Sequence, residues 1–227
     1  MLIKEYTDMN GYKVLQSKRA VRQLIMAVGF FVVVVGGWFY PILGYAMPMC
    51  MLIGIGIGLF RGRKWCDWYC PRGSFFDSWL GRVSPQKKIP GFFRRSSVRI
   101  GVFLFLMVMM VIQLVRRWPD PAAIGKFFVI MLTITSVVGV ILGLVFHQRV
   151  WCLLCPVGSA ANWVGRARHL LKIDSERCTE CGLCYKVCPI QIAPFEFKTD
   201  KVEAVRDGDC LKCGLCVAAC PQKALSL

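Results

Sequence analysis

Histidine is nearly absent from this sequence, and several cofactor motifs are missing as well. The 227 residues include only two histidines, His147 and His169. A haem held between transmembrane helices usually takes two facing histidines, and such a pair cannot be found, so we expect no haem. No G-x-G-x-x-G follows a strand, so no dinucleotide fold is indicated. No constellation of His, Asp and Ser stands out, and we do not expect this chain to be catalytic alone.

Acidic residues are also scarce, and the excess of positive charge is confined to one part of the chain. Residues 1–173 hold 22 Lys and Arg against five Asp and Glu, whereas residues 174–227 hold seven against eight. The basic residues flank apolar runs, as the positive-inside rule describes for membrane proteins. Because no nucleic-acid recognition motif accompanies them, we expect no nucleic-acid partner.

Charge is missing altogether from residues 23–60, a run of 38 residues. This length corresponds to two helices of the roughly 20 residues needed to cross a bilayer, with a turn at Pro41 and Gly44. Two more apolar runs follow the basic connector 61–99. The sequence predicts an α-helical membrane protein with four transmembrane helices, at about 22–40, 42–60, 100–115 and 127–146, arranged as two repeated hairpins. Pro48 and the glycines at 54, 56 and 58 predict that the second helix is broken or re-entrant.

The distribution of Lys and Arg predicts the orientation of these helices. We expect the segment 1–21, the connector 61–99 and everything after residue 147 to lie on the cytoplasmic side of the inner membrane. The turn near Pro41 and the link 116–126 then lie outside. Both termini, and most of the 13 cysteines, would face the reducing cytoplasm. Metal binding is therefore a better explanation of the cysteines than disulfide bonds.

The segment 174–227 repeats one cysteine pattern, C-x2-C-x2-C-x3-C-P, at residues 178–189 and 210–221. This spacing is typical of bacterial ferredoxins, in which three close cysteines hold one [4Fe–4S] cluster and the fourth reaches the other cluster. We predict a small α+β domain with two clusters; a pair of zinc sites is the alternative. The predicted ligands are Cys178, Cys181, Cys184 and Cys220 for cluster 1, and Cys210, Cys213, Cys216 and Cys188 for cluster 2.

A second repeat lies in the predicted membrane domain, residues 22–173. Residues 63–74 and 149–159 both read R-x-W-C, a short gap, then C-P-x-G-S, and each follows a long apolar run. Such a repeat indicates one structural unit used twice. Ser74 and Ser159 are expected to cap short helices that lie at the membrane interface. The two units together offer four thiols for a third [4Fe–4S] cluster, from Cys66, Cys70, Cys152 and Cys155.

Two alternatives remain for these four cysteines, namely a structural zinc site and thiols that bind nothing. If a cluster is present, electrons reach it through the other clusters, a partner, or a lipid-soluble carrier such as quinone. His147 and Arg149 lie at the predicted cytoplasmic end of the fourth helix and form a candidate quinone contact. The alternative is that His147 is simply a polar residue at a helix end.

Together, these motifs resemble the NapH family of membrane iron–sulfur proteins. The resemblance rests on Trp65-Cys66-x3-Cys70-Pro71, Trp151-Cys152-x2-Cys155-Pro156, four spans and a terminal double ferredoxin motif, and covers residues 20–227. Related proteins include the C-terminal part of NosR and the CcoG/RdxA type. The second pair departs from the family's usual C-x3-C-P. No Ser/Thr-Gly-Ala-Thr sequence is present to attach a flavin in the manner of NosR, so we expect no flavin.

The resemblance implies a quinol-oxidising or electron-relaying subunit that passes electrons to a partner reductase. We therefore predict a membrane-bound subunit that relays single electrons between quinone or quinol and other redox subunits of a membrane complex, with membrane lipid around it. One alternative is a maturation reductase that supplies electrons to a metal centre under construction, as the CcoG type implies. The other is a membrane anchor that only docks a catalytic subunit.

Overall fold

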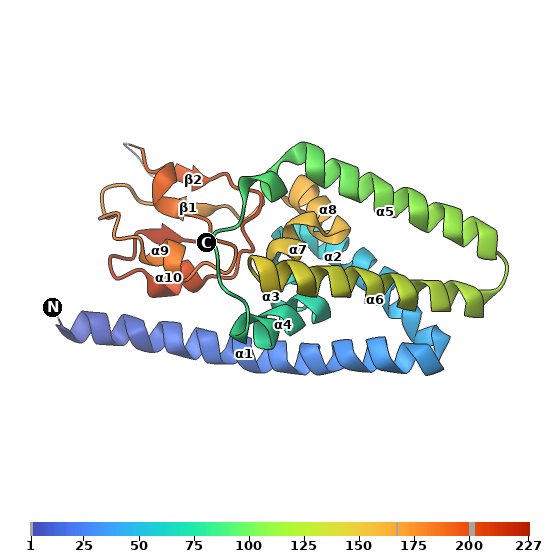
Figure 1. Cartoon of the computed structure of the whole chain (residues 1–227). Helices are drawn as coiled ribbons and strands as arrows, with labels where there is room; N and C mark the ends of the chain where they lie inside the picture. The colour runs from blue at the N-terminus through green and yellow to red at the C-terminus, as the bar shows by residue number, and fades with distance from the viewer. Residues whose placement is uncertain (1, 167, 200–202) are drawn as a thin grey trace.

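Four long helices form the membrane-spanning part of the chain. The computed structural model describes residues 2–166, 168–199 and 203–227. The four helical segments long and apolar enough to cross a membrane are Gly11–Phe39, Pro41–Arg61, Ser96–Arg117 and Pro121–Val145. They lie together at one end of the molecule, and a small domain with short strands lies at the other (Figure 1). The predicted number and order of spans are confirmed.

Helix α1, Leu2–Phe39, is much longer than its membrane span. The predicted N-terminal segment 1–21 is part of the same helix from Leu2 onward. This extension contains Lys, Arg, Gln and Leu, residues with a high helix propensity. It runs past the other long helices and lies beside the small C-terminal domain (Figure 1).

The second span is a continuous helix, so the prediction of a broken or re-entrant segment was wrong. A 3-10 turn, η1 (Pro41–Tyr45), leads directly into α2 (Ala46–Arg61). Pro48 lies in the first turn of α2, where a missing N–H removes no helical hydrogen bond. Gly54 and Gly58 are buried, because another helix packs closely against them. The glycines therefore mark a packing face, as they commonly do in membrane helices.

The two C-P-x-G-S motifs fold alike, each as two short helices separated by a sharp break. The first motif forms α3 (Lys64–Trp68) and α4 (Pro71–Ser78), and the second forms α7 (Val150–Leu154) and α8 (Pro156–Gly165). Proline disfavours helical backbone in the residue before it and starts the next helix well. The residues before the prolines, Cys70 and Cys155, accordingly have ψ angles of 113° and 129°.

The predicted caps at Ser74 and Ser159 were wrong, because the N-cap of each helix lies four residues earlier. Cys70 and Cys155 occupy the N-cap positions, and the Cys70 Sγ accepts a hydrogen bond from the Gly73 N–H. Both serines are instead fully buried within α4 and α8. The turns η2 (Leu80–Arg82) and η3 (Gly91–Arg94) then lead from α4 to α5 (Ser96–Arg117), which is followed by α6 (Pro121–Val145).

The C-terminal domain is built on a three-stranded antiparallel sheet with the order β2-β1-β3. Its elements are β1 (Leu171–Ile173), α9 (Leu183–Lys186), η4 (Pro194–Phe197), β2 (Glu203–Val205), α10 (Leu215–Ala219) and β3 (Leu225–Ser226). Leu171 pairs with Val205, and Ile173 pairs with Leu225. The domain therefore starts at β1, slightly before the predicted boundary at residue 174. Its apolar core continues into the membrane domain through Val150 and Leu153.

Candidate metal centres

The eight cysteines of the C-terminal domain surround two small cavities. One cavity is lined by Cys178, Cys181, Cys184 and Cys220, and the other by Cys188, Cys210, Cys213 and Cys216. Each group joins three close cysteines from one motif with the fourth cysteine of the other motif. This is the same grouping that the spacing predicts for two [4Fe–4S] clusters.

The loops that carry these cysteines repeat the same backbone conformation. Positive φ angles occur at Glu180, Gly182 and Gln191 in the first motif and at the corresponding Lys212, Gly214 and Lys223 in the second. The two glycines directly follow the second cysteine of each motif and have φ angles of 74° and 82°. Such left-handed turns form concave loops whose backbone N–H groups suit an anion. The donors and the loop shape therefore fit an iron–sulfur cluster in each cavity.

A third cavity, of about 110 Å³, lies where the two C-P-x-G-S motifs meet. All four predicted cysteines of these motifs line it: Cys66, Cys70, Cys152 and Cys155. Phe30 of α1, Met47 and Met51 of α2, and Leu132 of α6 complete the wall towards the membrane spans. The two repeated units are therefore brought face to face around one space.

The first arginine of each repeat reaches across to the cysteine of the other repeat. Arg63 Nη2 donates to the Cys152 carbonyl oxygen over 2.5 Å, and Arg149 Nη1 donates to the Cys66 carbonyl oxygen over 3.0 Å. The glycine of the C-P-x-G-S motif makes room for this contact. A Cβ on Gly158 would lie 2.7 Å from the Cys152 oxygen and 2.8 Å from Arg63 Nη2. The Arg and Gly of the motif are thus explained by one reciprocal contact between the repeats.

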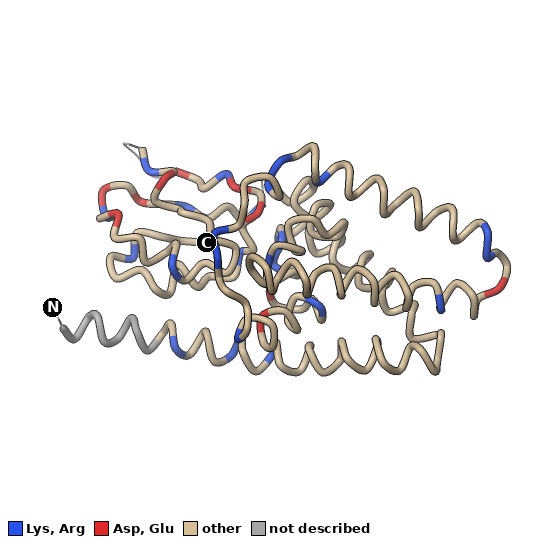
Figure 2. Tube along the Cα trace, in the orientation of Figure 1, with Lys and Arg blue, Asp and Glu red and all other residues tan. Residues whose placement is uncertain are grey.

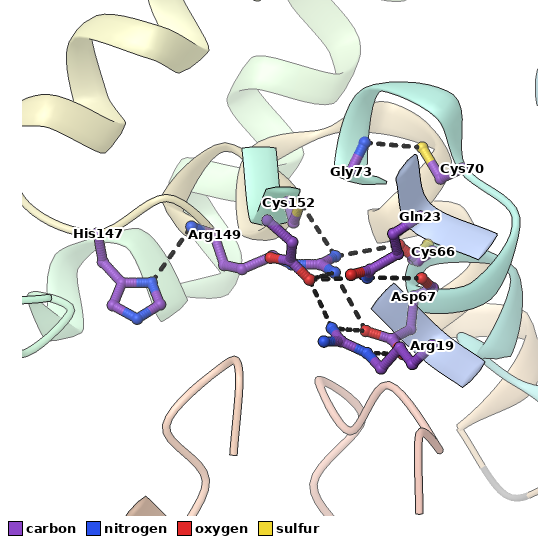
Figure 3. A network of polar contacts seen from close by, with 10 residues as sticks. Arg19, Gln23, Cys66, Asp67, Cys70, Gly73, His147, Arg149 and Cys152 are labelled. Carbon is purple, nitrogen blue, oxygen red and sulfur yellow. Dashed lines mark hydrogen bonds and ion pairs between the residues drawn. The ribbon is translucent and has the colours of Figure 1, made fainter. Parts of the chain in front are cut away.

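Arg149 is the centre of a buried ionic network (Figure 3). Its Nε is 2.7 Å from Asp77 Oδ1, and its Nη2 is 3.1 Å from Asp67 Oδ1. Arg19 from α1 reaches the same two carboxylates, and Gln23 donates to Asp77 over 2.9 Å. Burial by itself would raise the pKa of Asp77, but Arg149 and then Arg19 hold that pKa down to about 2. The carboxylate therefore stays ionised and fixes α1, α4 and α7 together.

Positive groups also face the thiols of the third cavity. Arg72 Nη2 is 3.1 Å from Cys155 Sγ, and Arg149 Nη1 is 3.8 Å from Cys152 Sγ. Burial raises the pKa of Cys70 to about 12, so the Cys70 thiol keeps its proton until a metal displaces it. Trp151 lines this cavity, and its buried indole N–H has no hydrogen-bond partner among the described residues. Thiols, cations and a free donor suit an anionic cluster, which Cys66, Cys70, Cys152 and Cys155 would hold.

The three cysteine sites follow an order from the bilayer to the exposed surface. Leu211, between two cysteines of the cluster 2 motif, shares an apolar core with Cys66. Burial, and secondly the nearby Asp67, raises the pKa of Cys213 in the same motif. Cys181, at the other cavity of the domain, is solvent-exposed. The cluster 2 cavity thus lies towards the membrane domain, and the cluster 1 cavity has a cysteine at the surface.

Comparison with known proteins finds iron–sulfur families over both parts of the chain. The model of a 4Fe–4S dicluster domain family matches residues 170–221, and that of a 4Fe–4S binding domain family matches residues 43–90 and 129–174. The chain is 30% identical to the ferredoxin-type protein NapH of Haemophilus influenzae over 61% of this chain and 53% of NapH. It is 28% identical to the methylamine utilization ferredoxin-type protein MauN of Paracoccus denitrificans, over 67% of this chain and 56% of MauN.

The chain belongs to the NapH-type family of 4Fe–4S ferredoxins. It is also 28% identical to an uncharacterised protein of Methanocaldococcus jannaschii, over 86% of this chain and 79% of that protein. It spans about half the length of the NapH and MauN relatives. No solved structure matches it. These relatives and family models support iron–sulfur electron transfer, and the four long apolar helices indicate an integral membrane protein.

The candidate quinone residues of this NapH-type chain lie outside the third cavity's lining. The guanidinium nitrogens of Arg149 all have partners, in Asp67, Asp77 and the carbonyl group of Cys66. His147 is buried, and its Nδ1 accepts a hydrogen bond from the Arg149 backbone N–H over 3.2 Å. Quinone contact at these two residues stays a prediction, and the geometry gives both of them a structural role.

The sequence interpretation missed the carboxylates that balance the buried arginines. Asp67 lies between the two cysteines of the first motif, Asp77 follows that motif, and Asp209 precedes Cys210. All three are buried against arginines in the structure. The available signal was their rarity, because residues 1–173 hold only five acidic residues and two of them lie beside the first cysteine pair.

Proposed function

We propose that this NapH-type chain relays single electrons between a lipid-soluble quinone in the membrane and a partner oxidoreductase on the cytoplasmic side. The observation that carries the proposal is the order of the three cysteine sites. The third cavity, which is the membrane-proximal site, adjoins the membrane spans, and the cluster 2 cavity lies next. The cluster 1 cavity is the last of the three and includes the exposed Cys181. A [4Fe–4S] cluster supplies a one-electron carrier where it is bound. The protein sets the spatial order of the three cysteine sites.

The residues on the membrane side of the third cavity support the proposal that a lipid-soluble electron carrier binds there. Phe30, Met47 and Leu132 form its wall towards the spans, and these side chains belong to three different membrane helices. Apolar pockets with a few polar groups are typical binding sites for small organic molecules. Arg72 is such a polar group, since its guanidinium bonds to Thr135 of α6 and lies over the Trp151 ring. A quinone head group is proposed to approach the four cysteines from this side.

The cytoplasmic orientation is supported by charge. Lys and Arg gather where the long helices meet the C-terminal domain, while most of the length of the spans has none (Figure 2). The positive-inside rule assigns that end to the cytoplasm. The partner oxidoreductase is then proposed to meet the C-terminal domain there, near Cys181.

The number of clusters is the first test of this proposal. Full-length protein purified anaerobically is expected to hold about 12 iron atoms per chain, and Cys66→Ser about 8, with the EPR signals of the remaining two clusters retained. Cys50→Ser is the matched control, because Cys50 lines the same cavity but lies outside both motifs, and it should keep the wild-type iron content. About 8 iron atoms in the unsubstituted chain would overturn the proposed route into the membrane.

Quinone-linked transfer is tested with the same variants. Cys66→Ser and Cys152→Ser are expected to abolish reduction or oxidation of the C-terminal clusters by quinol or quinone, whereas Cys50→Ser should not. Transfer at the wild-type rate in Cys66→Ser would show that electrons bypass the four-cysteine site. Loss of iron without loss of activity in the assembled complex would instead favour an anchor that only docks a catalytic subunit.

A further inference from the structure

The two membrane repeats share R-x-W-C and C-P-x-G-S, but they differ in the acidic residues near their buried arginines. Aligning Ser74 with Ser159 places Asp77 of α4 opposite Asn162 of α8. In the first repeat, Asp77 pairs with Arg149. In the second repeat, Asn162 has no charge to offer Arg63, the counterpart of Arg149. The membrane domain alone therefore leaves Arg63 without the carboxylate that Asp77 provides for Arg149.

The C-terminal domain supplies that carboxylate. Asp209 Oδ1 lies 2.9 Å from Arg63 Nη1 and 2.8 Å from Asn162 Nδ2. Arg99 Nη2, from α5, bonds to the same oxygen. Asp209 thus occupies, from another domain, the place that Asp77 holds within the first repeat.

The contact is buried on both sides. Arg63 is 1% exposed, Arg99 6% and Asp209 5%. Removing one partner of a buried ion pair leaves an uncompensated charge, which is strongly unfavourable unless water reaches it. Separation of the two domains would let water reach Arg63 and Arg99. Without its carboxylate the interface would therefore favour an open arrangement.

Asp209 is also directly joined to a cysteine of the cluster 2 cavity. It precedes Cys210, and Gly208 before it approaches Asn162 so closely that a Cβ would lie 2.0 Å from the Asn162 Oδ1. We propose that Asp209 is a positioning residue that docks the C-terminal domain on Arg63 and Arg99. It thereby holds the cluster 2 cysteines against the membrane-proximal cysteine site. The relevance of this docking to electron relay rests on the proposed function, whereas the docking itself does not.

Hydrogen exchange on the full-length protein in detergent micelles tests the docking. In Asp209→Asn, backbone amides of residues 158–166 and 207–213 are expected to exchange at least about tenfold faster than in the wild type. The reason is that Arg63 and Arg99 then have no carboxylate to balance their buried charges. Amides of residues 127–139 in the middle of α6 should keep their rates, which a general loss of stability would not allow. Asp174→Asn is the matched control, since Asp174 is a partly exposed carboxylate of the same domain paired with Arg177. Wild-type exchange at the interface in Asp209→Asn would overturn the proposal.

The double variant Asp209→Asn with Asn162→Asp separates docking from simple charge balance. In this variant the membrane domain itself offers Arg63 a carboxylate, as Asp77 does for Arg149. The double variant is also the one to use if Asp209→Asn does not accumulate in cells. Fast exchange at the interface in this variant supports docking by Asp209. Wild-type protection would mean that Arg63 needs only a nearby carboxylate, which would overturn the proposal.

Iron content measured on the same samples distinguishes the two proposals. A loosened interface in a protein that holds about 8 iron atoms per chain supports the docking role and overturns the third cluster. An unchanged interface in a protein that holds about 12 iron atoms per chain supports the third cluster and overturns the docking role.

Discussion

One buried arginine from each repeat provides the main polar contacts between the two repeats at the membrane-proximal site. Arg63 and Arg149 are 1% and 0% exposed, and each bonds to the cysteine carbonyl of the opposite repeat. A buried charge is tolerated only when it is paired and hydrogen-bonded. Asp67 and Asp77 satisfy Arg149, and Asp209 satisfies Arg63. The spacing of the four cysteines therefore depends on carboxylates that bind no metal themselves.

His147 makes the stability of this region depend on pH. Burial is the main reason that its pKa falls to about 4, from an ordinary value near 6.5. Below pH 6.5 the unfolded chain binds a proton here that the folded chain does not, so stability falls as the pH decreases from 6.5 towards 4. Between pH 7 and pH 5 this residue is expected to cost about 2 kcal/mol of stability.

His147→Gln should therefore have a flatter pH dependence of its thermal midpoint between pH 7 and pH 5 than the wild type. His169→Gln controls for loss of a histidine, because His169 is exposed and the chain has no others. Asp77 does not titrate in this window, since its pKa is about 2. Parallel pH profiles for the wild type and His147→Gln would contradict the prediction.

At the scale of elements, close packing between α2 and α8 holds the second repeat against the first hairpin. A Cβ on Gly58 would lie 3.1 Å from the Ala161 Cβ, and one on Gly165 would lie 2.4 Å from the Gly58 carbonyl oxygen. Small residues let helix backbones approach in membranes, where packing rather than water exclusion drives association. The contact brings Val157 and Gly158 of α8 to the third cavity, which α2 also lines.

Gly58→Leu is expected to destabilise the protein by about 1–3 kcal/mol, because the added side chain meets α8. Gly56 lies on the same helix with nothing within 4 Å of an added Cβ. Gly56→Leu should therefore leave stability unchanged or raise it slightly, since leucine is the better helix former. Thermal unfolding in micelles measures both variants, and equal midpoints would contradict a packing role for Gly58.

At the scale of the whole molecule, the N-terminal part of α1 and the C-terminal domain lie at the same end of the four spans (Figure 1). The opposite end carries η1 and the link between α5 and α6. Arg116, Arg117 and Asp120 lie at that link, so it is polar enough to leave the bilayer. The arrangement requires an even number of crossings between the termini, which the four spans provide.

Reporter fusions test this orientation in cells. A reporter active only in the cytoplasm should work when fused after Leu227 and fail when fused after Trp118, and a reporter active only outside should behave oppositely. Fusion after Arg82, in the basic connector, is the matched internal control and should resemble the C-terminal fusion. Activity of the outside reporter at Leu227 would contradict the proposed orientation of the protein in the membrane.

Local patterns in the sequence were sufficient to predict several features. The charge-free run 23–60 predicts two spans because a bilayer excludes charge over a fixed length of helix. The repeated ferredoxin spacing predicts both the domain and the grouping of its cysteines, and the structure places each group around its own cavity. The repeat of R-x-W-C indicated that two units meet. These features depend on neighbours in the chain or on an internal repeat.

Only the tertiary structure decided which residues balance charge and which allow close packing. Asp209 pairs with Arg63 across 146 positions, and no local pattern indicates such a partner. The α2 glycines predicted a broken helix because a lone sequence does not show the helix that packs on them. Ser74 and Ser159 were expected to cap helices, but the cysteine–proline step starts each helix earlier. Pairing and packing across the fold are non-local, and they became visible only once the chain was folded.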